Sequence, residues 1–468
     1  MTLYRSIARL LRFLLGVFFR RIVIVGDEQV PAEGDGAAIF AGNHTNSLID
    51  PAIIIAFAGR IVHFAARDGL FQSPILRPVL TALGAVPIAR RMDRKDGKVD
   101  NASAFDKLFD ILATGRAIGI FPEGISHDLS QLQPLKTGAA RIAFGVAQRN
   151  PDCPVRIVPT GLNYGRPKRF RSSVLVQFGE PITIDADWVA RFEADERATV
   201  RELTDMIDMR LRALTVNAED WQTIRVLDAV RRIYQPRGIG LEARVELSRR
   251  FNAAYGELAD QPAIAALFEK VSAYQERLHT IGLRDSDLLR DFSFWQILAR
   301  FYFNVLRIVF WMPLAIPGFV LHAPLAIIVG LFGVRLSPRK DVIGTSKLVA
   351  GIVLAFVSWA LLALGVGLAF GPLYGALAAL LVPLSGYATL RVLERYVSAR
   401  SLAISWLRFA RFRQEVADLR RERRDLERVV IETVQQFLPD DMEPLFLEAG
   451  LERIGRNTDS SPQVAVSS

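Results

Sequence analysis

The chain has 468 residues, of which 51% are hydrophobic, and its formal net charge is +9 at pH 7. This length allows two or three domains, and a hydrophobic share this high is unusual for a wholly soluble protein, so we expect membrane contact. The single cysteine, Cys153, excludes an intrachain disulfide, and the five histidines show no clustered spacing typical of a metal site. No nucleic-acid-binding signature accompanies the positive charge, so membrane lipid is the expected partner and nucleic acid is not.

The first 21 residues follow a helical pattern with two faces. Apolar residues fall on one face and arginines on another, which predicts an amphipathic helix over residues 1–21 that lies in the membrane interface. A signal peptide is the alternative, but Arg12 interrupts the apolar run and no small-residue cleavage site is evident. The apolar face comprises Leu3, Ile7, Leu10, Leu11, Leu14 and Phe18.

Residues 22–184 alternate between short apolar runs and helical patterns. This alternation is typical of an α/β domain with a mostly buried sheet flanked by helices, in which functional side chains lie in loops at the strand ends. The runs expected to form strands are Ile22–Val25, Ala37–Ala41, Ile61–Ala65, Ala85–Ala89, Ala117–Phe121, Val155–Pro159 and Val174–Phe178.

The run GNHTNSLIDP, from Gly42 to Pro51, places a histidine and a carboxylate where an apolar strand meets a helix. His44 precedes Asp50 by six positions, a spacing that does not align two side chains on one helical face, so His44 must reach Asp50 from the turn before the helix. A carboxylate that accepts from one ring nitrogen leaves the other basic, and the pair can then remove a proton from a hydroxyl. The alternative is that Asp50 only caps the helix and His44 is a polar turn residue.

Three further blocks follow in order: GAVPIAR at 84–90, FPEGISH at 121–127 and IVPTG at 157–161. With the His-Asp block, this ordered set resembles the glycerolipid acyltransferases of the PlsC type over roughly residues 37–182. One departure is that the interval between His44 and Asp50 is one residue longer than is usual in that family. The longer interval, FPEGISH and the run LKTGAARIA at 135–143 are more similar to the branch containing the fungal glycerol-3-phosphate/dihydroxyacetone-phosphate acyltransferases.

The resemblance implies roles for single residues. His44 and Asp50 would be catalytic, and Arg90 would bind a phosphate through its planar, permanently charged donor fork. A surface strand end is the alternative for Arg90, and Arg91 beside it leaves the choice open. The FPEG block is associated in the family with binding the glycerol backbone and phosphate, by holding hydroxyls, an arginine or a loop conformation. The other substrate-binding candidates are Glu123, Gly124, Ser126 and Lys136, with a solvated helix charge as an equal alternative for Lys136 and for Arg141.

Beyond the α/β domain the composition shifts from charged and helical to almost wholly apolar. Over Tyr302–Val334 we expect a proline-interrupted re-entrant hairpin, followed by two spanning helices, Val349–Phe370 and Leu373–Leu390. A single span from Tyr302 to His322 with a short second leg is the alternative. Basic residues flank the pair of spanning helices, which predicts that both of its ends are cytoplasmic.

The predicted fold class is α/β: a PlsC-like acyltransferase domain with a mostly buried sheet flanked by helices, then a helical region and C-terminal transmembrane helices. The predicted division is an interfacial helix at 1–21, the acyltransferase domain at 22–184, a helical region at 185–300, a membrane domain at 301–395, a charged helical tail at 396–455 and a disordered end at 456–468.

The predicted function is membrane-bound transfer of a fatty acyl group to glycerol 3-phosphate or dihydroxyacetone phosphate. The donor would be acyl-CoA or acyl carrier protein, acting as a co-substrate, and no cofactor is implied. An acceptor that is already acylated, 1-acylglycerol 3-phosphate, is the main alternative. A thioester hydrolase or a phospholipid transacylase is the alternative among other enzymes, and a non-catalytic lipid-binding membrane scaffold is more remote. We expect a multi-pass protein of the cell's inner membrane with its catalytic domain in the cytoplasm.

Overall fold

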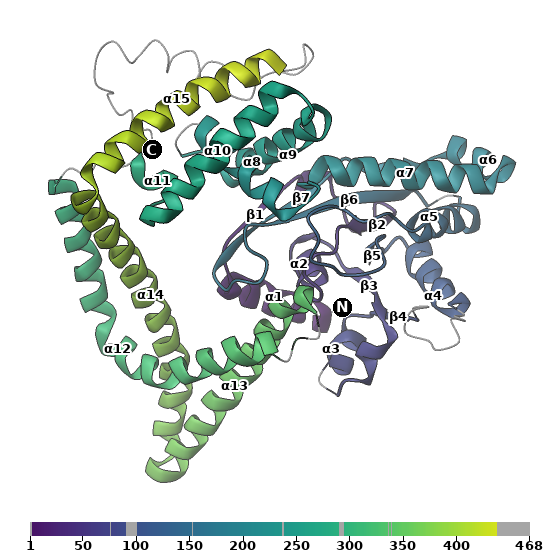
Figure 1. Ribbon diagram of the computed structural model, residues 1–468. Helices are drawn as coiled ribbons and strands as arrows, with labels where there is room; N and C mark the ends of the chain where they lie inside the picture. Colours follow the sequence, from purple (N-terminus) through teal and green to yellow (C-terminus); the bar gives the residue numbers. More distant parts are fainter. Residues whose placement is uncertain are drawn as a thin grey trace. The chain divides into compact units, whose positions relative to one another are not determined.

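The computed structural model describes residues 2–74, 76–89, 101–151, 153–235, 238–289, 294–335, 337 and 339–437. The chain divides into two compact units, each formed from two stretches of sequence. The first unit combines Met1–Asn217 with Pro324–Ser358, and the second combines Ala218–Ala323 with Trp359–Ser468. Figure 1 shows the elements of both along the chain.

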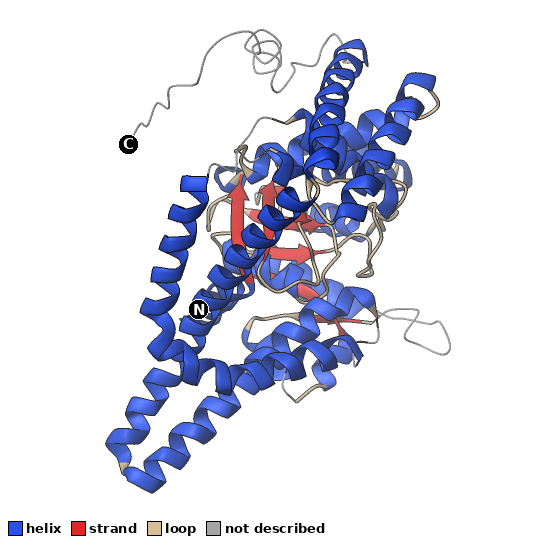
Figure 2. Cartoon of the chain, turned by 60° about the vertical axis from the view of Figure 1, so that its left-hand side comes forward, coloured by secondary structure: helices blue, strands red, loops and turns tan. Residues whose placement is uncertain are grey.

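The first unit contains an eight-stranded, mostly parallel sheet in the order β1-β7-β6-β2-β5-β3-β4, with β8 paired to β6 (Figure 2). Among the strands that the structure describes, only the pairings of β6 with β7 and with β8 are antiparallel. Each apolar run expected to form a strand overlaps one, and the predicted α/β class is confirmed. The strands are β1 (Phe19–Val25), β2 (Ala37–Gly42), β3 (Val62–Arg67), β4 (Val86–Ile88), β5 (Ala117–Ile120), β6 (Val155–Tyr164), β7 (Ser172–Phe178) and β8 (Ile182–Ile184).

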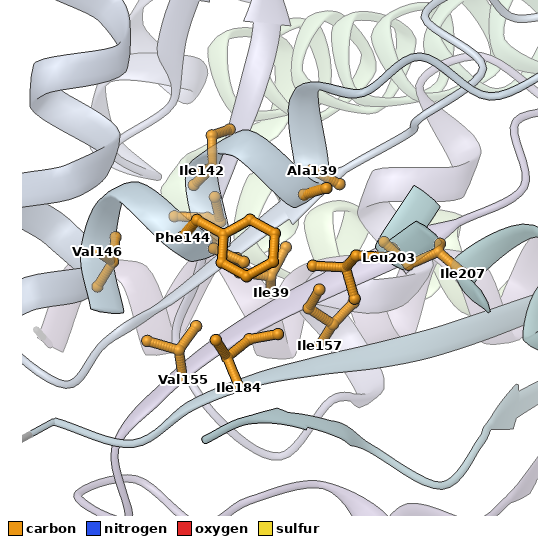
Figure 3. Close-up of a cluster of buried hydrophobic side chains, with 14 of the residues drawn as sticks. Ile39, Ala139, Ile142, Phe144, Val146, Val155, Ile157, Ile184, Leu203 and Ile207 are labelled. Carbon is orange, nitrogen blue, oxygen red and sulfur yellow. The ribbon is translucent and has the colours of Figure 1, made fainter. Parts of the chain in front are cut away.

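The central strand β2 is buried at every residue, and its side chains alternate between two apolar cores. Ile39 belongs to the core on one face of the sheet, shown in Figure 3, whereas Phe40 belongs to the core on the other face. Burial on both faces explains why this strand reads as a continuous apolar run without alternation.

Helices cover both faces of this sheet. On one face lie α4 (Ala102–Ala113), α5 (Gly138–Arg149), α6 (Ala186–Ala194) and α7 (Glu196–Leu214), and on the other lie α1 (Thr2–Phe18) and α2 (Ile49–Phe57). The short α3 (Leu76–Ala82) follows β3. Because Leu203 and Leu211 of α7 are completely buried in the sheet's core, the first unit extends past the predicted boundary at residue 184.

The N-terminal helix α1 has apolar residues on two sides. Its Tyr4 hydroxyl donates to the Val62 carbonyl at 3.0 Å and accepts from the Val62 amide at 2.9 Å, so one side is fixed to the sheet. Leu3 and Phe13 point away from this packing and are 62% and 66% exposed. The helix predicted over residues 1–21 is present as Thr2–Phe18, whereas residues 19–21 belong to β1, and its contact with a membrane interface stays a prediction.

The second unit is wholly helical in its described residues. A buried core joins α10 to α15, and it contains Val271 and Tyr274 from α10 and Leu419 from α15. Arg423, in the charged run of residues 420–424, is buried and paired with Asp285 at 3.0 Å. The helices are α8 (Trp221–Tyr234), α9 (Leu241–Leu258), α10 (Pro262–Ile281), α11 (Asp285–Leu288), α14 (Pro372–Arg411) and α15 (Arg413–Phe437), with the first part of α12 and the last part of α13.

Three helical stretches among the described residues are long and apolar enough to cross a membrane: Phe301–Arg335, Lys340–Phe370 and Pro372–Arg411. The last two contain the two predicted spanning helices. The predicted interruption by prolines is wrong, because residues 302–334 lie within one helix, α12 (Phe294–Arg335), and the re-entrant course of this segment in the membrane stays a prediction. Pro313, Pro317 and Pro324 are separated by four and seven positions. At roughly 3.6 residues per turn these positions share one helical face, so the missing N–H groups lie on one side and the rest of the hydrogen-bond ladder continues.

Candidate active site

His44 and Asp50 meet at the end of the central strand. His44 follows β2 by two positions, Asp50 lies in the first turn of α2, and the His44 Nδ1 and Asp50 Oδ2 atoms are 2.9 Å apart. The Asp50 carboxylate is completely buried, and the same oxygen accepts from the Asn46 amide at 2.7 Å. The turn brings the histidine back to the helix through Ser47, whose φ of 47° lies in the left-handed region.

The His44 ring has a fixed orientation. It stacks on the Phe121 ring with 4.0 Å between centroids and an interplanar angle of 8°. With Nδ1 donating to Asp50, Nε2 is the nitrogen that accepts protons, and it has no hydrogen-bond partner in the described part of the chain. A neutral imidazole held in this way can take a proton from a hydroxyl while the buried carboxylate stabilises the resulting positive charge.

Tyr164, at the end of β6, is a further member of this group that sequence reasoning missed. Its hydroxyl donates to Asp50 Oδ1 at 2.5 Å, so each carboxylate oxygen is bonded. Burial and the charge of Asp50 raise the pKa of Tyr164 well above its usual value, which keeps the hydroxyl protonated and donating. Tyr164 lies beside Asp50 because β6, the strand ending in IVPTGLNY, pairs with β2 in the sheet. Strand order cannot be read from one sequence, so no local signal identifies this tyrosine.

Glu123 supports the turn from the other side. Its Oε1 accepts from the backbone N–H of His44 at 2.7 Å, and its Oε2 accepts from the backbone N–H of Gln133 at 2.8 Å. Oε2 also pairs with His127 Nε2, and the His127 amide donates to the His44 carbonyl at 3.1 Å. Both oxygens of this buried carboxylate are therefore bonded to the protein, an arrangement suited to holding the loop conformation.

Gly124 and Lys136 are neighbours in space. Gly124 has a φ of 72°, and a Cβ built on it would come within 2.5 Å of Lys136 Nζ. A side chain at position 124 would therefore be strained and would displace the lysine. Lys136 is exposed, so its ammonium lies beside the Glu123 loop and faces solvent. Arg141 instead forms an exposed ion pair with Glu196 at 3.0 Å.

Ser126 is buried and its hydroxyl is fully engaged. It accepts from the Ser47 amide at 3.1 Å and donates to Asp341 Oδ2 at 2.7 Å. The structure thus brings His44, Asp50, Glu123 and Ser126 into one bonded network, and it places Gly124 and Lys136 at the edge of that network. Arg90 and Arg91 lie outside the described residues, and the phosphate-binding role of Arg90 stays a prediction.

Two family models match the chain. Residues 21–162 match the acyltransferase family, and residues 226–442 match the family described as glycerol-3-phosphate acyltransferase 2 C-terminal domain. The resemblance predicted from the ordered sequence blocks is therefore confirmed.

The chain is also similar to curated relatives. Glycerol-3-phosphate O-acyltransferase 2 of Saccharomyces cerevisiae is 34% identical over 275 residues, covering 55% of this chain and 37% of the relative. Glycerol-3-phosphate O-acyltransferase 1 of the same yeast is 34% identical over 283 residues, covering 59% of this chain and 36% of the relative. A 1-acyl-sn-glycerol-3-phosphate acyltransferase of Borreliella burgdorferi is 31% identical over 125 residues, covering 26% of this chain and 46% of the relative. The aligned parts span little more than a third of the length of the two yeast relatives.

Proposed function

We propose that this chain, which pairs an acyltransferase domain with a glycerol-3-phosphate acyltransferase 2 C-terminal domain, is a membrane-bound glycerol-3-phosphate O-acyltransferase. The observation that carries the proposal is the His44–Asp50 pair, with its 2.9 Å contact inside the segment that matches the acyltransferase family. A purely lipid-binding scaffold has no need of a base held by a buried carboxylate, so the pair favours catalysis.

The reaction proceeds by direct transfer. His44 Nε2 takes the proton from the acceptor hydroxyl as the oxygen attacks the thioester carbonyl, forming a tetrahedral oxyanion. Collapse of this intermediate forms the ester and releases the thiolate, which recovers the proton from the imidazolium. Asp50 stabilises the imidazolium through Nδ1, and backbone N–H groups are required for the oxyanion. No acyl-enzyme is needed, and the hydroxyl of Ser126 is already bonded to Asp341.

The acceptor we favour is glycerol 3-phosphate or dihydroxyacetone phosphate. The longer His-Asp interval and the FPEGISH block support this choice, as do the names of the two yeast relatives. The bacterial relative, whose name specifies 1-acyl-sn-glycerol 3-phosphate, keeps that acceptor as the second candidate. Acyl-CoA or acyl carrier protein would be the donor.

Lys136 and Arg90 would bind the acceptor's phosphate. Lys136 is exposed and lies against Gly124, whose missing side chain leaves room for the lysine beside the Glu123 loop. Glu123 and Ser126 would act indirectly, since their polar atoms already hold the loops around His44.

The three apolar helical stretches would anchor the protein in the membrane. Asp285, before α12, pairs with Arg423, after α14, so an even number of crossings separates them, and we assign the two crossings to α13 and α14. With both ends of this pair on the cytoplasmic side, the catalytic domain would face the cytoplasm. In that orientation the active site meets the water-soluble acceptor and donor, and the product enters the adjoining leaflet.

Transfer of a labelled acyl group to glycerol 3-phosphate by the detergent-solubilised chain tests this function. His44→Ala should abolish transfer and Asp50→Asn should reduce it by orders of magnitude, because an amide cannot stabilise the imidazolium. The matched control is His279→Ala, at an exposed position of α10, which should retain full activity. Full activity in folded His44→Ala protein would refute the mechanism. Transfer only to 1-acylglycerol 3-phosphate would select the second acceptor, and release of free fatty acid without any acceptor would indicate a hydrolase.

A further inference from the structure

The connection between the first two apolar helical stretches returns to the catalytic turn, residues 43–50. Thr345, near the start of α13 (Ile343–Phe370), lies 297 positions from Leu48 in the sequence, and its Oγ1 accepts from the Leu48 amide at 3.1 Å. The same hydroxyl donates to the Asn46 carbonyl at 3.3 Å. One buried hydroxyl therefore bridges two backbone groups on either side of Ser47.

A second contact reaches the same turn through Ser126. Asp341 is buried, and its Oδ2 accepts from the Ser126 hydroxyl at 2.7 Å while Ser126 accepts from the Ser47 amide at 3.1 Å. Arg339 pairs with the same Asp341 oxygen at 2.9 Å, so the carboxylate keeps a compensating charge. Asp341 thus holds the hydroxyl that holds the turn.

The backbone of this connection approaches the turn closely. A Cβ built on Gly344 would come within 2.5 Å of Asn46 Oδ1 and within 3.3 Å of Ile49 Cδ1. Lys347 Nζ donates to the Lys168 carbonyl at 3.3 Å, which fixes the next part of the connection. The close approach leaves no room for a side chain at position 344, so the backbone at Gly344 packs directly against the turn.

The turn needs such support because of its conformation. Ser47 adopts a left-handed φ of 47°, which is unfavourable for a residue with a side chain and persists only where the surroundings hold it. The N-terminus of α2 also has no side-chain cap of its own. Between His44 and Asp50, the groups bonded by Thr345 and Ser126 are the Asn46 carbonyl and the amides of Ser47 and Leu48.

We propose that Thr345 and Asp341 are positioning residues for acyl transfer, and that the connection between α12 and α13 completes the active site. This inference rests on the proposed function, because it assigns these residues to holding His44 and Asp50 in register. Both lie outside the matched acyltransferase segment, residues 21–162, and inside the matched C-terminal segment, residues 226–442. The acyltransferase segment alone therefore lacks part of the support for its catalytic pair.

The test compares Thr345→Val, which removes the hydroxyl at nearly constant shape, with Thr345→Ser, which keeps it. In the detergent-solubilised full chain, kcat of Thr345→Val should fall about tenfold to about hundredfold, with each KM changed less than about twofold, because misplacement affects the transition state and not substrate binding. Thr345→Ser should restore kcat. Amide hydrogen exchange in the peptide covering residues 44–50 should rise in Thr345→Val only.

The matched control is Ser346→Ala. The Ser346 hydroxyl bonds to the Ser337 hydroxyl at 2.9 Å and not to the turn, so kcat and exchange at residues 44–50 should stay unchanged. Equal losses in Thr345→Val and Ser346→Ala would indicate a general weakening of α13 and would overturn the inference. Equal losses in Thr345→Val and Thr345→Ser would overturn it as well.

A double-mutant cycle tests the second contact. Ser126→Ala and Asp341→Ala should each lower kcat, and the double variant should lose about as much as either single one, because both remove the same contact to the Ser47 amide. Fully additive losses would overturn the proposed role of Asp341. If the unmodified chain transfers no acyl group to any acceptor, the proposed function fails separately. In that case amide hydrogen exchange at residues 44–50 tests by itself whether Thr345 supports the turn. Unchanged exchange in Thr345→Val overturns the inference.

Discussion

Removal of the Tyr164 hydroxyl tests how strongly catalysis depends on the orientation of Asp50. Tyr164→Phe deletes the donor that bonds to Asp50 Oδ1 at 2.5 Å and leaves that oxygen without its tyrosine partner in a completely buried carboxylate. A hydrogen bond to a charged group contributes about 1.5–3 kcal/mol. Each 1.36 kcal/mol corresponds to about tenfold in rate. If the whole free energy of this hydrogen bond is lost from the transition state, kcat falls by about 10-fold to about 150-fold.

The assay is the initial rate of labelled acyl transfer at varied acceptor and donor concentrations. We expect the loss in kcat with little change in either KM, because Tyr164 bonds to the catalytic pair and not to a substrate. Tyr4→Phe is the matched control, since it deletes another buried phenol hydroxyl whose partner is the Val62 backbone. A Tyr164→Phe protein with unchanged kcat and unchanged thermal stability would refute the reasoning. An equal loss of kcat in Tyr4→Phe would indicate general destabilisation instead.

Three further predictions concern the acceptor, the loop support and the topology. Arg90→Ala should raise the KM for the phosphate-bearing acceptor far more than that for the donor in steady-state kinetics; an equal effect on both would move the phosphate site elsewhere. Glu123→Gln should lower the free energy of unfolding by about 1–3 kcal/mol and should also lower kcat, because an amide nitrogen would face backbone or ring donors. A change confined to the KM for the acceptor would instead indicate that Glu123 binds the substrate directly. In a Cys153→Ser background, Lys340→Cys and Ser398→Cys should be shielded from an impermeant thiol reagent added outside intact cells, whereas Leu373→Cys should be labelled; labelling of Lys340→Cys would reverse the assigned orientation.

Local sequence signals were sufficient for the strands and for the catalytic pair. Short apolar runs between turns identified every strand of the sheet except β8, a segment of three residues, Ile182–Ile184. The His-Asp contact followed from strand-helix junction chemistry, because both residues lie within one turn. These features depend on neighbours in the sequence, which periodicity and turn residues report directly.

The remaining parts of the site depend on distant contacts. Tyr164 reaches Asp50 over 114 positions and Thr345 reaches Leu48 over 297, and no local pattern distinguishes these residues from ordinary packing or helix-start residues. The buried pair of Arg423 and Asp285 was missed for the same reason, because a charged run reads as solvated until its partner is known. In α12, the prolines predict a break in the helix, although their placement on one face allows the helix to continue.

The bonding of Asp50 explains why these distant contacts matter for chemistry. A completely buried carboxylate is tolerated only when its oxygens are bonded, and here the donors come from the His44 ring, the Asn46 amide and Tyr164. With those donors in place, the anion is already oriented toward the ring before the proton arrives, so the imidazolium forms without rearrangement of its surroundings. The Asn46 amide belongs to the strained turn that Thr345 and Ser126 hold. Loss of that support would misdirect one of the three donors, and the cost would fall on the proton-transfer step even though every catalytic residue remains present.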